Sequence, residues 1–117
     1  MRAAPERLAP RTRRLLADPA NELLLSAASA WELAIKSALG KVRLPAPLSE
    51  YVTSRMAEDG VLALPVRHAH ALRVAELPFH HRDPFDRLLI AQAQIEGLSL
   101  LTADRELRAY DVAIIRA

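Results

Sequence analysis

Four acidic residues that lie far apart in the sequence could together bind a divalent metal ion. Each lies near the start of a predicted helix: Glu32, Asp83, Asp86 and Asp104. Clustered carboxylates repel one another and are usually retained where a cation neutralises them. Oxygen ligands in a chain without cysteine suit Mg²⁺ or Mn²⁺. Such metal sites hydrolyse phosphodiester bonds by activating a water molecule and stabilising charge on the attacking and leaving oxygens.

The elements that must position these acids alternate between strand and helix. The clearest helix spans residues 84 to 96, because Asp83 is a good N-cap, Pro84 suits the first helical position and Gly97 can end the helix in a left-handed conformation. Apolar runs and caps predict the remaining elements. The strands are expected at 22 to 26, 61 to 64, 98 to 101 and 112 to 115, and the other helices at 8 to 18, 29 to 40, 48 to 59, 67 to 77 and 103 to 108.

Strands separated by helices predict an α/β fold, in which a parallel sheet carries helices on both faces. Each crossover helix then begins at the carboxyl edge of the sheet, where ligands of open α/β sheets bind. Ser29 and Glu32 have the spacing of a capping box, which places Glu32 in the first turn of its helix. We therefore expect Glu32, Asp86 and Asp104 to converge within roughly 10 Å, the scale of a site for one or two metal ions.

Each acid by itself has a simpler explanation. Acidic side chains in the first turn of a helix are favoured by the helix dipole and by capping, typically by about 0.3 to 1 kcal/mol each. Convergence of several acids from unconnected segments is the observation that capping alone does not explain.

The histidines are rival metal ligands. His68 and His70 are two residues apart on a predicted helix, where that spacing points them in different directions, so both are predicted to be surface residues. His80 and His81 precede Asp83 in a predicted loop, where they either contact a substrate phosphate or are solvated.

Three further side chains have two interpretations each. Trp31, beside Glu32, is predicted to be a core residue or a dimer contact. Arg82 and Arg87 bracket the carboxylates and either hold phosphate or balance charge.

Composition limits the classes of protein. A chain of 117 residues that is 51% hydrophobic is expected to form one domain with a substantial core. The formal charge of +2 gives no global field that would attract nucleic acid. The arginines near the N-terminus either suit phosphate, because the planar guanidinium donates bidentately, or reflect the base composition of the genome. We find no apolar run of the roughly 18 residues that span a bilayer and no signal-peptide pattern, so we expect a cytoplasmic protein without a membrane partner.

Three stretches closely resemble the PIN-domain toxins of the VapC type: residues 26 to 36, 81 to 93 and 101 to 105. The resemblance covers nearly the whole chain in the right order. It implies a PIN-like three-layer fold and a metal-dependent endoribonuclease of a type II toxin-antitoxin pair. It also implies Mg²⁺ or Mn²⁺ as cofactor, an RNA substrate, a VapB-type antitoxin as partner and a homodimer.

The resemblance also assigns roles to residues. Glu32, Asp86 and Asp104 correspond to the second, third and fourth acids of the family, which are catalytic and bind metal, and Asp83 to an accessory acid. Thr102 matches the hydroxyl that accompanies the fourth acid. We place it with Arg82 and Arg87 as candidate contacts to the substrate.

The start of the sequence departs from the family pattern. The family begins with an apolar strand that ends in a metal-binding Asp, ahead of the helix that here spans residues 8 to 18. Residues 1 to 6 have no strand pattern, and the first aspartate is Asp18. We therefore expect a single PIN-like domain, residues 1 to 117, that is truncated at its N-terminus and lacks the central strand of the sheet. A misplaced start site, a shortened chain or a decayed gene would each produce this sequence.

The departure leaves two hypotheses about function. The first is a ribonuclease that binds metal weakly and cleaves RNA poorly until the missing strand and its Asp are supplied. The second is a catalytically inactive PIN-like protein that only binds an antitoxin or RNA.

Overall fold

A computed structural model describes residue 14 and residues 16–116 of the chain. The predicted helix over residues 8 to 18 lies outside the described residues except at its end, where residues 14, 16 and 17 are helical. The structure divides into two compact units, of which one is Glu22–Pro65 and the other takes the rest of the described chain. No helix among the described residues combines the length and the apolar character needed to cross a membrane.

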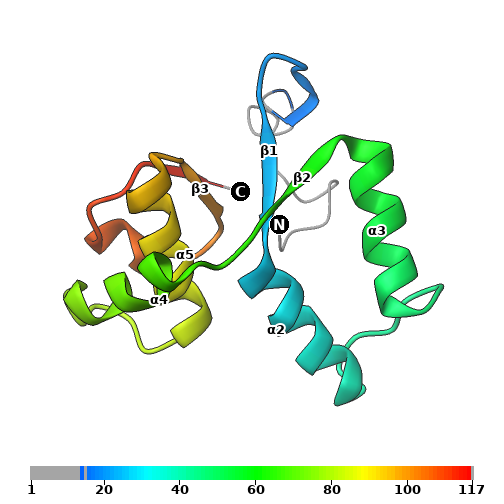
Figure 1. Ribbon diagram of the computed structural model, residues 1–117, viewed down its shortest axis with the longest axis horizontal. Coiled ribbons are helices and arrows are strands. Elements are labelled where there is room, and N and C mark those ends of the chain that lie inside the picture. The colour runs from blue at the N-terminus through cyan, green and yellow to red at the C-terminus, as the bar shows by residue number, and fades with distance from the viewer. Residues whose placement is uncertain (1–13, 15, 117) are drawn as a thin grey trace. The chain divides into compact units, whose positions relative to one another are not determined.

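The unit Glu22–Pro65 contains two strands and two helices (Figure 1): β1 (Leu23–Ser26), α2 (Ala27–Ala38), α3 (Leu48–Asp59) and β2 (Val61–Leu64). β1 and β2 pair in parallel, with Leu23 opposite Val61 and Ser26 opposite Leu64. α3 ends at Gly60, whose φ of 68° is in the left-handed region where glycine carries no steric penalty. The predicted bounds of α3 and β2 are therefore confirmed.

Helix α2 begins earlier than the capping box at Ser29 predicts. Its N-cap is Ser26, whose hydroxyl accepts a hydrogen bond from the backbone N–H of Ala28 at 3.0 Å. Ser26 ends the strand and is already a favourable cap, and alanine is the best helix former, so the helix starts directly after the strand. The predicted capping box is wrong, and Glu32 lies in the second turn of α2 rather than in the first.

From residue 66 onward, the other unit contains two α-helices, two 3₁₀ segments and two strands. In chain order they are α4 (His68–Arg73), the 3₁₀ turn η2 (Val74–Glu76), α5 (Pro84–Glu96), β3 (Leu100–Thr102), the 3₁₀ helix η3 (Arg105–Ala109) and β4 (Ile114–Arg116). β3 and β4 pair in parallel, with Leu100 opposite Ile114. The predicted helix over 67 to 77 is thus split between α4 and η2. The two strands end one residue beyond the positions that the apolar runs predicted.

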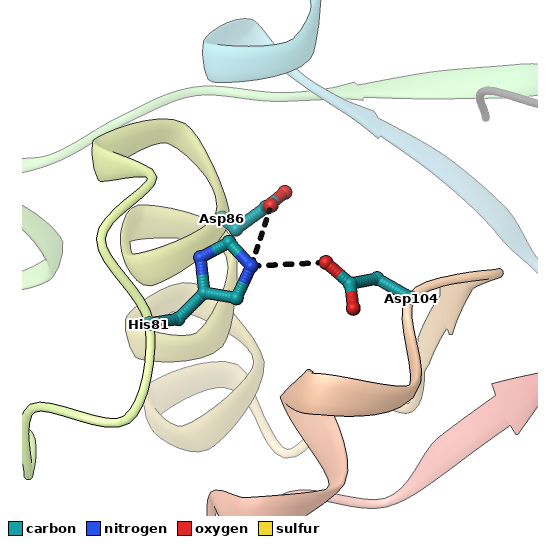
Figure 2. Close-up of side chains that lie close together, drawn as sticks. All are labelled: His81, Asp86 and Asp104. Atoms are coloured by element: carbon teal, nitrogen blue, oxygen red, sulfur yellow. Dashed lines mark hydrogen bonds and ion pairs between the residues drawn. The ribbon is translucent and has the colours of Figure 1, made fainter.

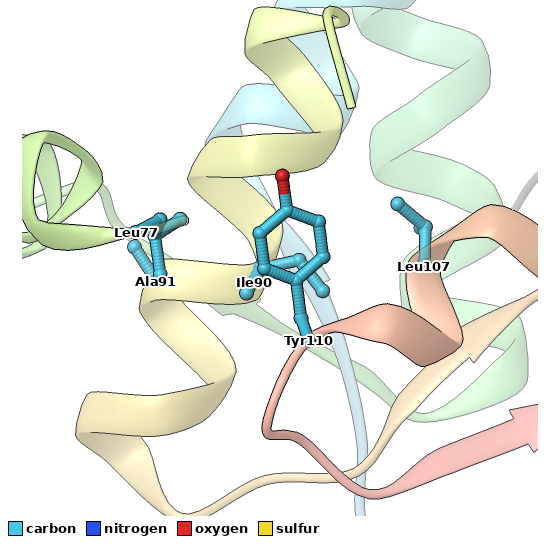
Figure 3. Packing of buried hydrophobic residues seen from close by; sticks show 5 residues of the cluster. All are labelled: Leu77, Ile90, Ala91, Leu107 and Tyr110. Atoms are coloured by element: carbon cyan, nitrogen blue, oxygen red, sulfur yellow. The ribbon is translucent and has the colours of Figure 1, made fainter. Parts of the chain in front are cut away.

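Helix α5 has the predicted bounds and supplies the centre of this unit's core. Ile90 and Ala91 are fully buried and pack with residues from outside the helix (Figure 3), namely Leu77, Leu107 and Tyr110. The apolar face of α5 is thereby covered by the chain before the helix and by the η3 region after it. This packing holds the middle of α5 against the rest of the unit, and Asp86 lies in the first turn of the same helix.

The α/β class with parallel strands is confirmed, whereas the single four-stranded sheet that we expected is not what the described residues form. They form two separate two-stranded parallel sheets, one of β1 and β2 and the other of β3 and β4.

Candidate metal centre

Three side chains bring ligand atoms together in the unit that contains α5. One ligand-capable atom each from His81, Asp86 and Asp104 lies within 4.8 Å of the other two (Figure 2). His81 comes from the loop before α5, Asp86 from the first turn of α5, and Asp104 from the turn after β3. Two of the three acids that we expected to converge therefore do so, and they come from separate segments of the chain.

Asp86 is the buried member of this cluster. Its side chain is 5% exposed, and its Oδ2 lies 3.9 Å from Nε2 of His81. A buried carboxylate is costly unless it is paired or binds a cation. The cap formed by Asp83 fixes the turn that carries it, because Oδ1 of Asp83 accepts from the N–H groups of Phe85 and Asp86 at 2.8 and 3.2 Å.

Asp104 is the more open member, with a side chain that is 37% exposed. It is the N-cap of η3, and its Oδ1 accepts from the N–H of Glu106 at 2.9 Å. Its own N–H donates to Oγ1 of Thr102 at 3.1 Å. The hydroxyl of Thr102 therefore holds the turn that presents Asp104, while its contact with substrate stays a prediction.

His81 has a larger part in the site than the sequence indicated. Its Nε2 lies 2.9 Å from Oδ2 of Asp104 and 3.4 Å from Oε2 of Glu106, and its Nδ1 accepts from the N–H of Asp83 at 3.0 Å. The interpretation of a solvated loop is therefore wrong for His81. Glu106 was also missed, although its position two residues after Asp104 is a signal for an additional acid at the same helix start.

The loop that carries His81 is held by Tyr110. The Tyr110 hydroxyl accepts from the backbone N–H groups of His80 and His81, at 3.1 and 3.0 Å. Arg87 donates to the same hydroxyl at 3.1 Å, and also to the backbone carbonyls of Pro78 and Val74 at 3.0 Å each. These bonds hold the backbone of the loop and of the residues just before it to the side chains of Arg87 and Tyr110.

Arg87 therefore has a structural role that sequence reasoning did not identify. It is buried, and its guanidinium lies 4.7 Å from the centre of the Phe79 ring. Since its hydrogen bonds serve the fold, we leave Arg87 out of the proposed substrate contacts. Arg82 is exposed and stays a candidate for that role.

Asp83 and Glu32 have the following positions. The bonds of Asp83 to the first turn of α5 are those of an N-cap, so its accessory role at a metal stays a prediction. Glu32 belongs to the unit Glu22–Pro65, where Nζ of Lys36 lies 3.7 Å from its Oε2. Its convergence with Asp86 and Asp104 also stays a prediction.

The prediction that His70 is a surface residue is wrong. His70 is fully buried, its Nδ1 accepts from the N–H of Arg67 at 3.0 Å, and its Nε2 lies 3.0 Å from Oε1 of Glu96. A histidine in the first turn of α4 can cap that turn with one nitrogen and reach α5 with the other, which the two-residue spacing does not reveal. His68 is exposed as predicted.

Trp31 is 61% exposed, so it is not a core residue, and a dimer contact stays a prediction.

The donor set fits Mg²⁺ or Mn²⁺. A hard cation of this kind binds oxygen ligands at about 2.1 Å in octahedral geometry, so two ligand atoms on one ion are about 3 to 4 Å apart. The atoms of the cluster lie within 4.8 Å of one another, so Asp86 and Asp104 need only a small movement to share an ion. One ligand would be buried and the other open to a substrate.

Comparisons with known proteins identify the family of the chain. The chain is 51% identical over 59 residues to ribonuclease VapC16 of Mycobacterium tuberculosis (strain ATCC 25618 / H37Rv), a match that covers 50% of this chain and 42% of that protein. It thus spans less than half the length of the relative that it matches. The family model of the PIN domain matches residues 3–113. Because that match takes in both units and nearly all of the sequence, the chain belongs to the PIN domain family.

Proposed function

We propose that this protein is a Mg²⁺- or Mn²⁺-dependent endoribonuclease, the toxin of a type II toxin-antitoxin pair. The observation that carries the proposal is the approach of Asp86 and Asp104, from α5 and from the turn after β3, to within 4.8 Å in the cluster with His81. Membership of the PIN domain family and the similarity to a ribonuclease of the VapC type support it.

In this proposal Asp86 and Asp104 hold the metal ion, and Glu32 completes the acidic site. The ion, when bound, supplies charge stabilisation and an activated water for phosphodiester hydrolysis. The buried Asp86 presents its carboxyl group at a fixed position, because the capped first turn of α5 restricts its backbone. Asp104 lies at the open side, where an RNA backbone can approach. Arg82 and Thr102 are the proposed contacts to that backbone.

The proposal extends to the whole protein. We infer that the two compact units are parts of one PIN-like domain over residues 1 to 117, because the family model matches residues 3–113, a range that takes in both units. A VapB-type antitoxin and a second copy of the chain are the proposed protein partners, and the cytoplasm, where RNA is present, is the proposed location. These assignments rest on the family.

Because we expect the 117-residue chain to cleave RNA poorly, the test uses the chain extended at its N-terminus by an apolar strand that ends in Asp. The extended protein is incubated with single-stranded RNA and Mn²⁺, with and without a chelator. Cleavage that the chelator abolishes supports the proposal. Chelator-resistant cleavage would contradict the role of the metal. RNA binding without cleavage would favour the alternative, a catalytically inactive PIN-like protein.

A further inference from the structure

Both ring nitrogens of His81 have hydrogen-bond partners, and this determines where its proton lies. The backbone N–H of Asp83 points to Nδ1 at 3.0 Å. An amide N–H can only donate, so Nδ1 must offer its lone pair. The ring proton then lies on Nε2, where the partner is Oδ2 of Asp104 at 2.9 Å. Because a carboxylate accepts, this is an N–H donated by His81 to Asp104.

This tautomer excludes Nε2 of His81 as a metal ligand in the observed conformation. A histidine nitrogen binds a metal through its lone pair, and a nitrogen that carries a proton has none to offer. His81 therefore differs in role from Asp86 and Asp104, although its Nε2 lies in the same cluster. Its contacts are those of an outer partner that orients a ligand.

The contacts of Asp104 show what His81 adds. Oδ1 of Asp104 accepts from the N–H of Glu106 at 2.9 Å, and Oδ2 accepts from His81. Because both oxygens accept hydrogen bonds, the carboxylate cannot rotate about its terminal torsion without losing a partner. Each carboxylate oxygen has two lone-pair sites, so an oxygen that accepts a hydrogen bond can also bind a cation. Nε2 of His81 also lies 3.9 Å from Oδ2 of Asp86, and so its N–H dipole offsets part of the repulsion between the two acids.

We propose that His81 is a positioning residue, which orients the Asp104 carboxylate through an Nε2–H hydrogen bond so that Asp104 and Asp86 can receive a divalent cation together. The proposal rests on the proposed function, because it deepens the account of that metal site. The Tyr110 hydroxyl, which holds the backbone N–H groups of His80 and His81, keeps the ring in reach of Asp104.

Two substitutions separate this role from a merely structural one. His81→Asn keeps an acceptor for the N–H of Asp83, since an Asn oxygen accepts from the N–H two residues on, as Asp83 does for Phe85. Its side chain is too short to replace the bond to Asp104. His81→Gln does the opposite. It places an amide N–H near the position of Nε2, where it can donate to Asp104, and it removes the acceptor for the backbone N–H of Asp83. His68→Asn is the matched control at an exposed histidine of the same unit.

The experiment uses the 117-residue chain and three measurements. Long-range ¹H–¹⁵N correlation spectra of the metal-free protein report the tautomer of His81, Mn²⁺ titration reports metal affinity, and urea unfolding reports stability. We expect the Nε2–H tautomer, a Mn²⁺ affinity at least about tenfold lower for His81→Asn at unchanged stability, and a partial recovery of affinity for His81→Gln. His68→Asn should leave all three unchanged.

The outcomes distinguish this proposal from the proposed function. A proton on Nδ1, or a Mn²⁺ affinity that His81→Asn leaves unchanged, would overturn the positioning role while the metal site stands. If His81→Gln lost as much affinity as His81→Asn, the Nε2–H donor would not be the feature that matters. Absence of Mn²⁺ binding by the unsubstituted chain would contradict the proposed function and the role of His81 with it.

Discussion

Arg87 donates a hydrogen bond from Nη1 to the hydroxyl of Tyr110 at 3.1 Å, and both residues are buried. Arg87 lies one residue after Asp86 on α5, and Tyr110 follows η3, whose N-cap is Asp104. The pair thus connects the two segments that carry the clustered acids. It also holds the loop that precedes α5, through the bonds to Pro78, His80 and His81.

Substitution of Tyr110 by Phe should therefore affect both the fold and the site. The change removes one hydroxyl that accepts from three N–H groups, and buried donors without a partner cost about 1 to 3 kcal/mol. We expect the free energy of unfolding in urea to fall by about that amount, and Mn²⁺ affinity to fall because His81 is no longer held. Tyr51→Phe, at the chain's other tyrosine, is the control and should change stability by less than about 0.5 kcal/mol. Equal effects of the two substitutions would show that the loop does not depend on Tyr110.

The two arginines that bracket Asp86 should behave differently. Arg87→Lys removes the planar fork that reaches Val74, Pro78 and Tyr110, so we expect a loss of about 2 kcal/mol or more in the free energy of unfolding. Arg82→Lys, at an exposed position, should leave stability within about 0.5 kcal/mol. If Arg82 contacts RNA, the substitution should instead raise KM for RNA at unchanged kcat. A destabilised Arg82→Lys beside a stable Arg87→Lys would reverse the roles that we assign.

The elements that the sequence predicted most accurately are those with unambiguous ends. α5 lies between the Asp83 cap and Gly97, and α3 ends at Gly60, so local chemistry alone determines their bounds. α2 was misplaced because Ser26 and Ser29 are both suitable caps, and the choice between them depends on where β1 ends. The pairing of strands into two separate sheets is a long-range property, which the alternation of helix and strand does not contain.

The sequence predicted the parts of the site that follow from helix starts, and it did not predict the parts that depend on contacts between distant segments. Asp86 and Asp104 follow from helix starts at one edge of a parallel arrangement, which is a consequence of topology. His81 and Arg87 act through side chains that cross to other segments, over separations of 23 residues to Asp104 and to Tyr110 respectively. Spacing along the chain carries no signal for such contacts, so the sequence left Arg87 with two interpretations, phosphate binding and charge balance, and did not indicate its structural role.

Substitutions at Asp83 and Asp86 separate capping from metal binding. Asn is as good an N-cap as Asp, so Asp83→Asn should retain α5 and its stability, whereas Asp83→Ala should cost about 1 kcal/mol. If Asp83 only caps, Asp83→Asn should also keep Mn²⁺ affinity. Asp86→Asn should lower that affinity by more than the roughly 10- to 100-fold typical of losing an outer partner, because it removes a ligand. Calorimetric titration with Mn²⁺ measures the affinity of both variants. An equal loss of affinity in Asp83→Asn and Asp86→Asn would show that Asp83 is a ligand as well.

Cleavage of single-stranded RNA in Mn²⁺ tests the central claim most directly, on the 117-residue chain and on the same chain extended by an apolar strand that ends in Asp. The extension adds a carboxylate to the proposed ligands Glu32, Asp86 and Asp104. A hard cation is retained according to the number of oxygen ligands that face it. We predict that the extended protein cleaves RNA, that a chelator or Asp86→Asn abolishes cleavage without unfolding the protein, and that the 117-residue chain cleaves weakly or not at all. Strong chelator-sensitive cleavage by the shorter chain would show that the added Asp is dispensable, and cleavage that survives Asp86→Asn would contradict the assignment of the metal site.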